Sequence, residues 1–346
     1  MLEHGGNLRD AVKNFGRPLE DWVDLSTGIN PYFYPVPAVS AHAWHRLPEP
    51  SDALTTAAQE YYNAPHMLPV AGTQAAIQAL PRLRKTLHAT SKIVVSAPSY
   101  AEHAYQWRQA GHTVTECPYP ELDAASHTAD VVVVCNPNNP TGETLEAAQL
   151  LAWARRLAER GGWLIVDEAF ADTLPELSVA AHSQQPGLIV LRSVGKFFGL
   201  AGIRLGFVAA ETALLRMLSS FLGPWTISGP AQEIAISALH DRHWQQQTAL
   251  HLQEQGHRLR SLLLTHQISS SGTDLFQWAS HRDLNSCTEI FWQFMAQHGI
   301  WLRWFAEGEA RPHGVRFGLP GSEAAWGRLE KVLSAWNKKH AFTAES

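Results

Sequence analysis

The sequence lacks the features that mark several specialised classes of protein. Its three cysteines, Cys117, Cys135 and Cys287, are widely separated and odd in number, which argues against a disulfide framework or a cysteine-based metal site. The 18 histidines form no HExxH motif and no other paired ligand spacing, so we expect no metal site and interpret nearly all of them as packing or surface residues. Lysine and arginine total 27 against 32 acidic residues, and the net charge of -5 leaves no basic excess for nucleic acid.

Long apolar runs are missing as well. The longest, such as residues 131–134 and 163–166, fall far short of the roughly 20 residues that a membrane helix needs. The first ten residues contain no apolar core of a signal peptide. We therefore expect a cytoplasmic protein with no membrane partner.

The chain does have enough material for more than one hydrophobic core. It has 346 residues, of which 45% are hydrophobic and 17% charged, so we expect a large domain and a smaller one. From about residue 66 to 210, short apolar strands alternate with amphipathic helices, which predicts a mainly parallel sheet covered on both faces. After about residue 230, long helices and scattered strands predict an α+β domain. We place the large domain at residues 41–230 and the smaller one at residues 1–40 and 231–346.

Polar segments stand at or just after the ends of several predicted strands, where open α/β sheets build their sites. The first is Gly72-Thr73 at a helix start, whose exposed N–H groups could hold a phosphate, although such a start is also an ordinary helix cap. The second is the turn from Asn136 to Gly142. Its prolines hold the turn rigid and leave a side-chain carboxamide of one of its asparagines free to act as a hydrogen-bond donor.

The third segment is an acidic pair, Asp167-Glu168, at the end of an apolar strand. A carboxylate in this place can bind the N–H of a pyridinium ring. The same pattern also resembles the magnesium site of a nucleotide-hydrolysing enzyme. Such an enzyme also needs a phosphate-binding loop with the sequence GxxxxGK[ST], which is not present here. The only Gly-Lys pair, Gly195-Lys196, is followed by Phe197.

The fourth segment runs from Ser193 to Gly206 and contains Lys196 among aromatic residues and glycines. A lysine in such surroundings is desolvated, which makes its amine a usable nucleophile. Ser193 and Arg204 lie on either side of it and could close on a bound phosphate as hydrogen-bond donor and cation.

In combination, these segments resemble those of the fold-type I pyridoxal 5'-phosphate (PLP) enzymes, the aspartate aminotransferase superfamily, from about residue 25 to 335. The resemblance implies an α/β protein of the PLP-dependent transferase fold type I, with a mainly parallel seven-stranded sheet between helices and a smaller α+β domain. It implies PLP as cofactor, with Lys196 and Asp167 as catalytic residues. The cofactor-binding residues that it implies are Gly72, Thr73, Tyr100, Asn139, Asp167, Ser193, Lys196 and Arg204.

Two positions depart from the pattern of this superfamily. Many relatives carry tyrosine where Phe170 stands, so Asn139 would hold the phenolic oxygen of the cofactor without that help. Histidinol-phosphate aminotransferases and threonine-phosphate decarboxylases commonly have an Arg-Tyr-Pro sequence whose tyrosine reaches the cofactor of the neighbouring subunit. Here the sequence is Arg46-Leu47-Pro48, which puts that contact in doubt.

The N-terminal region narrows the resemblance further. His4-Gly5-Gly6-Asn7 and the segment from Leu25 to Pro31 resemble the opening of the threonine-phosphate decarboxylases of cobalamin biosynthesis. A Gly-Gly pair after histidine offers N–H donors and an imidazole to an acidic group, while an unimportant flexible N-terminus is the alternative. The resemblance implies a homodimer and a small phosphorylated amino acid, L-threonine O-3-phosphate, as substrate. The substrate-binding residues would be His4, Gly5, Gly6, Asn30, Asn139, Arg303 and Arg316.

Two other hypotheses stay open. An aminotransferase acting on histidinol phosphate or a similar phosphorylated amine would use the same cofactor residues. A non-catalytic protein of the same fold, such as a regulator, is disfavoured because Lys196, Asp167 and Asn139 are all present.

Overall fold

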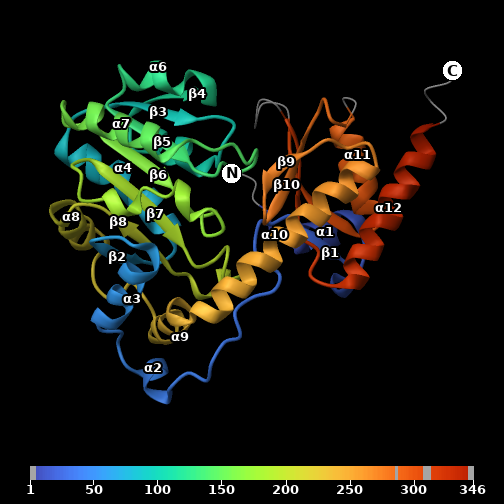
Figure 1. The fold of residues 1–346 in the computed structure, drawn as a ribbon, viewed down its shortest axis with the longest axis horizontal. Helices are drawn as coiled ribbons and strands as arrows, with labels where there is room; N and C mark the ends of the chain where they lie inside the picture. The colour runs from blue at the N-terminus through green and yellow to red at the C-terminus, as the bar shows by residue number, and fades with distance from the viewer. Residues whose placement is uncertain (1–4, 285–286, 307–312, 342–346) are drawn as a thin grey trace. The chain divides into compact units, whose positions relative to one another are not determined.

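The computed structural model describes residues 5–284, 287–306 and 313–341, and the chain divides into two compact units. Unit 1 comprises residues 1–32, 140–142 and 250–346, and unit 2 comprises residues 33–139 and 143–249 (Figure 1). The domain boundaries expected from the sequence, near residues 40 and 230, stay a prediction.

Unit 2 is built on a seven-stranded sheet in the order β2-β8-β7-β6-β5-β3-β4, which confirms the predicted α/β fold. Neighbours from β7 to β4 pair in parallel, whereas β8 is antiparallel to both β7 and β2. The strands are β2 (Met67–Val70), β3 (Lys92–Ser96), β4 (Thr113–Cys117), β5 (Val131–Cys135), β6 (Trp163–Asp167), β7 (Leu188–Ser193) and β8 (Gly206–Ala209).

Both faces of this sheet are covered, since its strand residues are buried on both sides. Val131 and Val133 belong to a core cluster with residues of α4, α5 and α8, while the intervening Val132 and Val134 are equally buried on the other face. The helices are α2 (Ala41–His45), α3 (Asp52–Tyr62), α4 (Thr73–Leu87), α5 (Glu102–Gln109), α6 (Leu122–Ser126), α7 (Ala147–Ala158), α8 (Thr212–Leu222) and α9 (Gly229–His240). Short 3-10 turns occur at Tyr119–Glu121, Pro175–Leu177, Ala180–His182 and Ala201–Ile203.

The register of the parallel strands brings their carboxyl ends to one edge of the sheet. Cys135 at the end of β5 lies opposite Asp167 at the end of β6, and Asp167 lies opposite Leu191 in β7. The polar segments that the sequence places after these strands therefore start side by side.

Unit 1 contains a five-stranded sheet in the order β1-β11-β12-β10-β9, with β1 parallel to β11 and the other pairs antiparallel. Its strands are β1 (Val23–Leu25), β9 (Ser271–Thr273), β10 (Phe276–Ser280), β11 (Ile300–Phe305) and β12 (Gly314–Gly318). Its helices are α1 (Leu8–Phe15), a 3-10 turn at Leu19–Asp21, the part of α10 (Arg242–Thr265) that follows residue 249, α11 (Thr288–Gln297) and α12 (Glu323–Ala341). Within the described residues, no helix has the combined length and apolarity that crossing a membrane requires.

An aromatic cluster fixes the N-terminal helix of unit 1. Phe15 of α1 meets Trp22, Trp292 and Trp301 edge to face, with ring centroids 6.0 to 6.1 Å apart. Trp22 and Trp292 also contact Trp301, which lies in β11 two residues before Arg303. The start of the chain is therefore held beside a strand that carries a predicted substrate residue.

Alanine substitutions at two glycines, one before β6 and one after it, would test how closely the backbone packs around this strand. Gly161 and Gly187 have φ of 69° and 73°, but a Cβ placed on Gly187 would lie 2.3 Å from the carbonyl oxygen of Gly162, whereas one on Gly161 would meet nothing within 4 Å. We expect Gly161→Ala to lower the free energy of unfolding by about 1 kcal/mol, the cost of the left-handed backbone. Gly187→Ala should cost about 1–3 kcal/mol more, because the chain must move. Urea unfolding of both variants measures this difference, and equal losses would contradict it.

Candidate active site

The centre of the candidate site is the carboxylate of Asp167, which is buried at the end of β6. Its Oδ1 accepts a hydrogen bond from the backbone N of Ala169 at 3.1 Å, and its Oδ2 lies 2.9 Å from Nε2 of His103. Both oxygens therefore have a protein partner that fixes the plane of the carboxylate. This is the residue for which the sequence predicts a contact to a pyridinium nitrogen.

His103, the partner of Asp167, is a residue that the sequence reasoning missed. It lies in the first turn of α5, and its side chain is buried. Burial lowers the pKa of its imidazole, but the hydrogen bonds to Asp167 and Cys135 outweigh burial and raise the pKa to about 10. At neutral pH, His103 is thus a cation that donates to Asp167. The available signal was its position three residues after Tyr100, in the turn that leads into α5, where the backbone N of His103 donates to the carbonyl oxygen of Tyr100 and the two rings lie 6.0 Å apart.

Cys135 completes a group of three buried side chains with His103 and Asp167, whose possible ligand atoms all lie within 4.8 Å of one another. A metal ion would need the lone pair of the imidazole. The raised pKa of His103 favours its protonated form, in which this nitrogen donates to Asp167 and has no lone pair to offer a metal.

The residues predicted to bind a phosphate meet at the start of α4. Gly72 precedes this helix with φ of 71°, and a Cβ placed on it would lie 2.6 Å from a guanidinium nitrogen of Arg204. A Cβ placed on Gly206 would lie 2.8 Å from the backbone N of Thr73. Glycine at these two positions lets Arg204 and the N–H groups of the first helical turn approach the same space. No side chain caps α4, so its first turn presents N–H groups and a positive dipole end to an anion.

Ser193 is the last residue of β7, and Lys196 lies in the loop that leads from β7 to β8. The Oγ of Ser193 accepts a hydrogen bond from the backbone N of Gly195 at 3.2 Å, which tightens the turn before the lysine. Lys196 is half-buried, and its Nζ lies 5.5 Å from the ring centroid of Phe170. The buried Phe197 follows, so the aromatic surroundings expected from the sequence are present.

Tyr100 and Asn139 come from the turns after β3 and β5. The hydroxyl of Tyr100 donates to Oε1 of Gln74 in α4 at 3.2 Å, and burial, then the charge of Glu102, raise its pKa. The turn before Asn139 is held by Asn136, whose side chain exchanges hydrogen bonds with the backbone of Leu145 at 3.0 and 2.8 Å. Asn139 itself is half-buried. Unit 2 thus brings the predicted cofactor residues to the carboxyl edge of one sheet.

Glu168, the neighbour of Asp167, belongs to a separate buried ion network. Its Oε2 accepts from Arg192 at 2.8 Å, and Arg192 also reaches Asp172 at 3.2 Å. Tyr61 donates to the same oxygen of Asp172 at 3.1 Å. Burial raises the pKa of Glu168 and of Asp172, and Arg192 offsets this only in part. Because Arg192 precedes Ser193 and Glu168 follows Asp167, this network ties together the strand ends that carry two predicted cofactor residues.

The remaining predicted substrate residues lie in unit 1. Arg303 in β11 is opposite Arg316 in β12, and both side chains are buried, with 8% and 6% of their surface exposed. Side chains at directly opposed positions share one face of a sheet, so both arginines project from the same face. The guanidinium of Arg303 lies over the ring of Phe305, 4.4 Å from its centroid, and that of Arg316 lies 5.3 Å from the ring centroid of Phe276. Arg316 Nη2 donates to the carbonyl oxygen of Ser26 at 2.7 Å, and the backbone N of Gly6 donates to the hydroxyl of the same serine at 2.7 Å.

The structure thus places Gly5, Gly6 and Arg316 around Ser26. Asn30 is buried, and its Oδ1 accepts from the backbone N of Tyr32 at 2.8 Å, which holds the turn after β1. His4 lies outside the described residues. Asn139, which we also predicted to contact the substrate, lies in unit 2 with the cofactor residues.

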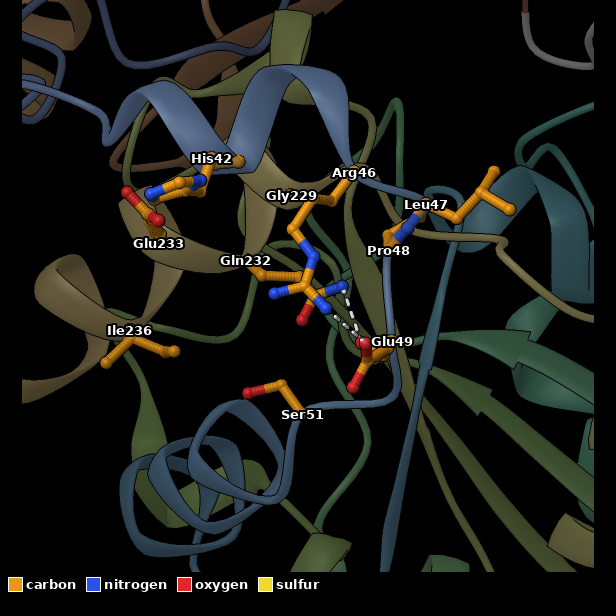
Figure 2. Close-up of a pocket in the computed structure, with 11 residues that line it drawn as sticks. His42, Arg46, Leu47, Pro48, Glu49, Ser51, Gly229, Gln232, Glu233 and Ile236 are labelled. Carbon is orange, nitrogen blue, oxygen red and sulfur yellow. Dashed lines mark hydrogen bonds and ion pairs between the residues drawn. The ribbon is translucent and has the colours of Figure 1, made fainter.

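Leu47, which replaces the tyrosine of the Arg-Tyr-Pro sequence found in related enzymes, lines a surface pocket of unit 2. Figure 2 shows Arg46 reaching Glu49, at 3.1 Å, while Leu47 points away from this ion pair. The side chain of Leu47 is 67% exposed. The residues that line the pocket are His42, Ala43, Arg46, Leu47, Pro48, Glu49, Ser51, Gly229, Gln232, Glu233 and Ile236.

Comparison with known proteins agrees with the geometry of the site. The model of the family "aminotransferase class I and II" matches residues 20–326. The threonine-phosphate decarboxylase of Pseudomonas aeruginosa is 50% identical over 334 residues, which cover 96% of this chain and 97% of that protein.

Solved structures share the fold at much lower identity. The histidinol-phosphate aminotransferase of Sinorhizobium meliloti in complex with pyridoxal-5'-phosphate has a TM-score of 0.80 at 18% identity, covering 97% of this chain and 96% of that one. The L-threonine-O-3-phosphate decarboxylase of Porphyromonas gingivalis has a TM-score of 0.72 at 18% identity, covering 91% and 99%. At these identities, the two structures establish the fold alone.

The pair of His103 and Asp167 predicts an alkaline loss of stability. The pKa of His103 in the folded protein, about 10, is above its ordinary value of 6.5, so its stabilising contribution is complete below pH 6.5 and is lost as the pH rises through 10. We expect His103→Gln to lower the free energy of unfolding of the cofactor-free protein by about 2 kcal/mol near pH 6.5. This difference from the wild type should shrink toward pH 10.

A buried histidine without a raised pKa provides the control for this experiment. Burial lowers the pKa of His112, so the effect of His112→Gln should stay constant between pH 7 and 10. Urea unfolding at several pH values measures both differences. An effect of His103→Gln that does not change with pH would contradict the charge assignment.

Proposed function

The chain belongs to the class I and II aminotransferase family, and from this premise we propose that it is a PLP-dependent lyase that decarboxylates L-threonine O-3-phosphate. The product would be (R)-1-amino-2-propanol O-2-phosphate, a precursor in cobalamin biosynthesis. The observation that carries the proposal is the pair of buried arginines, Arg303 and Arg316, on one face of the unit 1 sheet beside the Gly5-Gly6 segment. The near full-length similarity to a threonine-phosphate decarboxylase supports it.

The residues of unit 2 fit PLP as cofactor. The close approach of Gly72 to Arg204 and of Gly206 to Thr73 forms a cradle of N–H groups and a cation, which suits a phosphate. Asp167 offers a fixed carboxylate for the ring nitrogen, and Lys196 offers an amine for the covalent bond. When bound, PLP supplies an electron sink for the electron pair left at the substrate Cα.

Each cofactor residue has a distinct role in this proposal. Asp167, held in place by His103, would accept a hydrogen bond from the ring nitrogen. Thr73, Ser193 and Arg204 would hold the phosphate of the cofactor, Tyr100 would lie against its ring, and Asn139 would donate to its phenolic oxygen. Lys196 would carry the cofactor, and its amine would supply the proton to Cα.

Arg303 and Arg316 bind the acidic groups of the substrate. The two arginines project from opposed positions of one sheet face, and a phosphate dianion would accept charge-assisted hydrogen bonds from both. The backbone N–H of Gly5 would add a donor, as would the imidazole of His4 that the sequence predicts, while the N–H of Gly6 is already donated to Ser26. Binding energy from the remote phosphate fixes the orientation of the substrate at Cα, so that the bond to the carboxylate breaks rather than the bond to hydrogen. Carbon dioxide leaves, and the electron pair at Cα takes up the proton from Lys196.

A homodimer is part of the proposal. Large apolar side chains of unit 2 are exposed, with Trp44 at 70%, Leu47 at 67% and Trp225 at 60%, and a second copy of the chain would cover such residues. The cytoplasmic location expected from the sequence stays a prediction.

The reaction type is tested by giving the PLP-loaded protein L-threonine O-3-phosphate and following carbon dioxide. We expect carbon dioxide release without any added keto acid. A parallel reaction with histidinol phosphate and 2-oxoglutarate should form no glutamate. Lys196→Ala should lose both the visible absorbance of the lysine-bound cofactor and carbon dioxide release. Glutamate formation without carbon dioxide release would make the protein an aminotransferase.

The substrate role of Arg303 is tested by Arg303→Gln, which removes the charge but keeps a polar side chain. A hydrogen bond to a charged group contributes about 1.5–3 kcal/mol, so we expect KM for L-threonine O-3-phosphate to rise about 10- to 100-fold. Arg282→Gln, at an exposed arginine of the same unit, is the matched control and should leave KM unchanged. Equal KM values for the two variants would remove Arg303 from the substrate site.

A further inference from the structure

Ser26 is a buried residue of unit 1 that neither the sequence nor the proposed mechanism assigns to the site. It follows β1 directly, and none of its surface is exposed. Its backbone N and its hydroxyl both donate to Oδ1 of Asp24, at 2.9 and 2.6 Å. Asp24 therefore fixes both the backbone and the side chain of Ser26.

Only one orientation of the Ser26 hydroxyl proton allows the hydrogen bonds to both Asp24 and Gly6. An ionised carboxylate can only accept a hydrogen bond, so the single hydroxyl proton points to Asp24. A backbone N–H can only donate, so the oxygen accepts from Gly6 at 2.7 Å. The contact holds the Gly5-Gly6 segment at a point 20 residues away in the sequence.

The carbonyl oxygen of Ser26 serves the second predicted substrate group. It accepts from Nη2 of Arg316 at 2.7 Å, and the arginine is 94% buried because only 6% of its surface is exposed. Backbone segments pack tightly against each other on both sides of this contact. A Cβ placed on Gly5 would lie 2.2 Å from the same carbonyl oxygen, and one placed on Gly318 would lie 2.2 Å from the carbonyl oxygen of Thr27.

We propose that Asp24 and Ser26 are positioning residues that fix the Gly5-Gly6 segment and Arg316 at one point before the substrate binds. The inference rests on the proposed function, since it names the residues that shape the acid-binding part of that site. Neither residue is among those assigned to the cofactor. Their contribution is preorganisation: the Gly5-Gly6 backbone and the guanidinium of Arg316 need not be ordered by the substrate itself, which strengthens its binding.

Ser26→Ala tests the proposal in the PLP-loaded enzyme. The variant keeps the carbonyl oxygen but removes the acceptor of the Gly6 N–H. We expect KM for L-threonine O-3-phosphate to rise about tenfold, as for one lost hydrogen bond, with kcat within about twofold of the wild type. Gly5→Ala should raise KM further, because its Cβ collides with the carbonyl oxygen that holds Arg316. Asp24→Asn, which keeps an acceptor oxygen, should stay closer to the wild type than Asp24→Ala.

Ser280→Ala is the matched control. Ser280 lies in the same unit and has the same pair of bonds to an aspartate, with its N and hydroxyl 2.8 and 2.6 Å from Oδ2 of Asp283. In thermal unfolding, Ser280→Ala should lose about as much stability as Ser26→Ala, while its KM for L-threonine O-3-phosphate stays unchanged. Equal KM values for Ser26→Ala and Ser280→Ala would overturn the proposal.

Hydrogen exchange gives a readout that does not depend on catalysis. In the wild type, the amide of Gly6 should be protected, and Ser26→Ala should speed its exchange without speeding exchange in β11 or β12. Unchanged exchange at Gly6 would overturn the proposal whatever the kinetics. If the wild type releases no carbon dioxide but Gly6 loses protection in Ser26→Ala, the proposed function fails while the contact at Ser26 holds.

Discussion

The hydrogen bond between Asp167 and His103 joins the end of a central strand to the first turn of α5, and the cofactor site is arranged around it. A carboxylate at this depth is costly unless a donor or a cation accompanies it. His103 provides both, since its pKa is raised to about 10, and its ring lies 6.0 Å from that of Tyr100, which stands in the turn just before α5. The carboxylate proposed to bind the cofactor ring and the tyrosine proposed to stack on it are thus linked through one histidine.

A second buried charge network lies next to the first because Glu168 directly follows Asp167, the last residue of β6. Asp167 faces the site, while Glu168 bonds to Arg192, which also binds Asp172. One arginine thus serves two buried carboxylates, and burial raises the pKa of both. The edge of the sheet is polar on both faces, and the ion network fixes the backbone from which Asp167 and Ser193 project.

The sequence predicted the parts of this site that local pattern and strand order determine. Apolar runs such as residues 131–134 indicated buried parallel strands, and parallel strands bring their following segments to one edge, so Asn139, Asp167 and Lys196 could be grouped before the structure was known. His103 and Ser26 could not be found in this way. Their roles depend on contacts across 64 and 290 residues, which no local pattern encodes. Gly5 was recognised as part of a motif, but its need to lie against a carbonyl oxygen is visible only in three dimensions.

The residues proposed to bind the cofactor lie in unit 2, and most of those proposed to bind the substrate lie in unit 1. This division suggests how one kind of cofactor site can serve different reactions. Unit 2 holds the residues assigned to PLP, and these are the same residues that an aminotransferase would need. Unit 1 holds the buried Arg303 and Arg316 and the contact of Gly6 with Ser26, which concern the acidic groups of the substrate. Since the cofactor stabilises the electron pair from any bond broken at Cα, the residues that orient the substrate decide which bond breaks. In the proposed function, the choice of decarboxylation would therefore depend on the small set of hydrogen bonds that hold Arg316 and the Gly5-Gly6 segment of unit 1 in place.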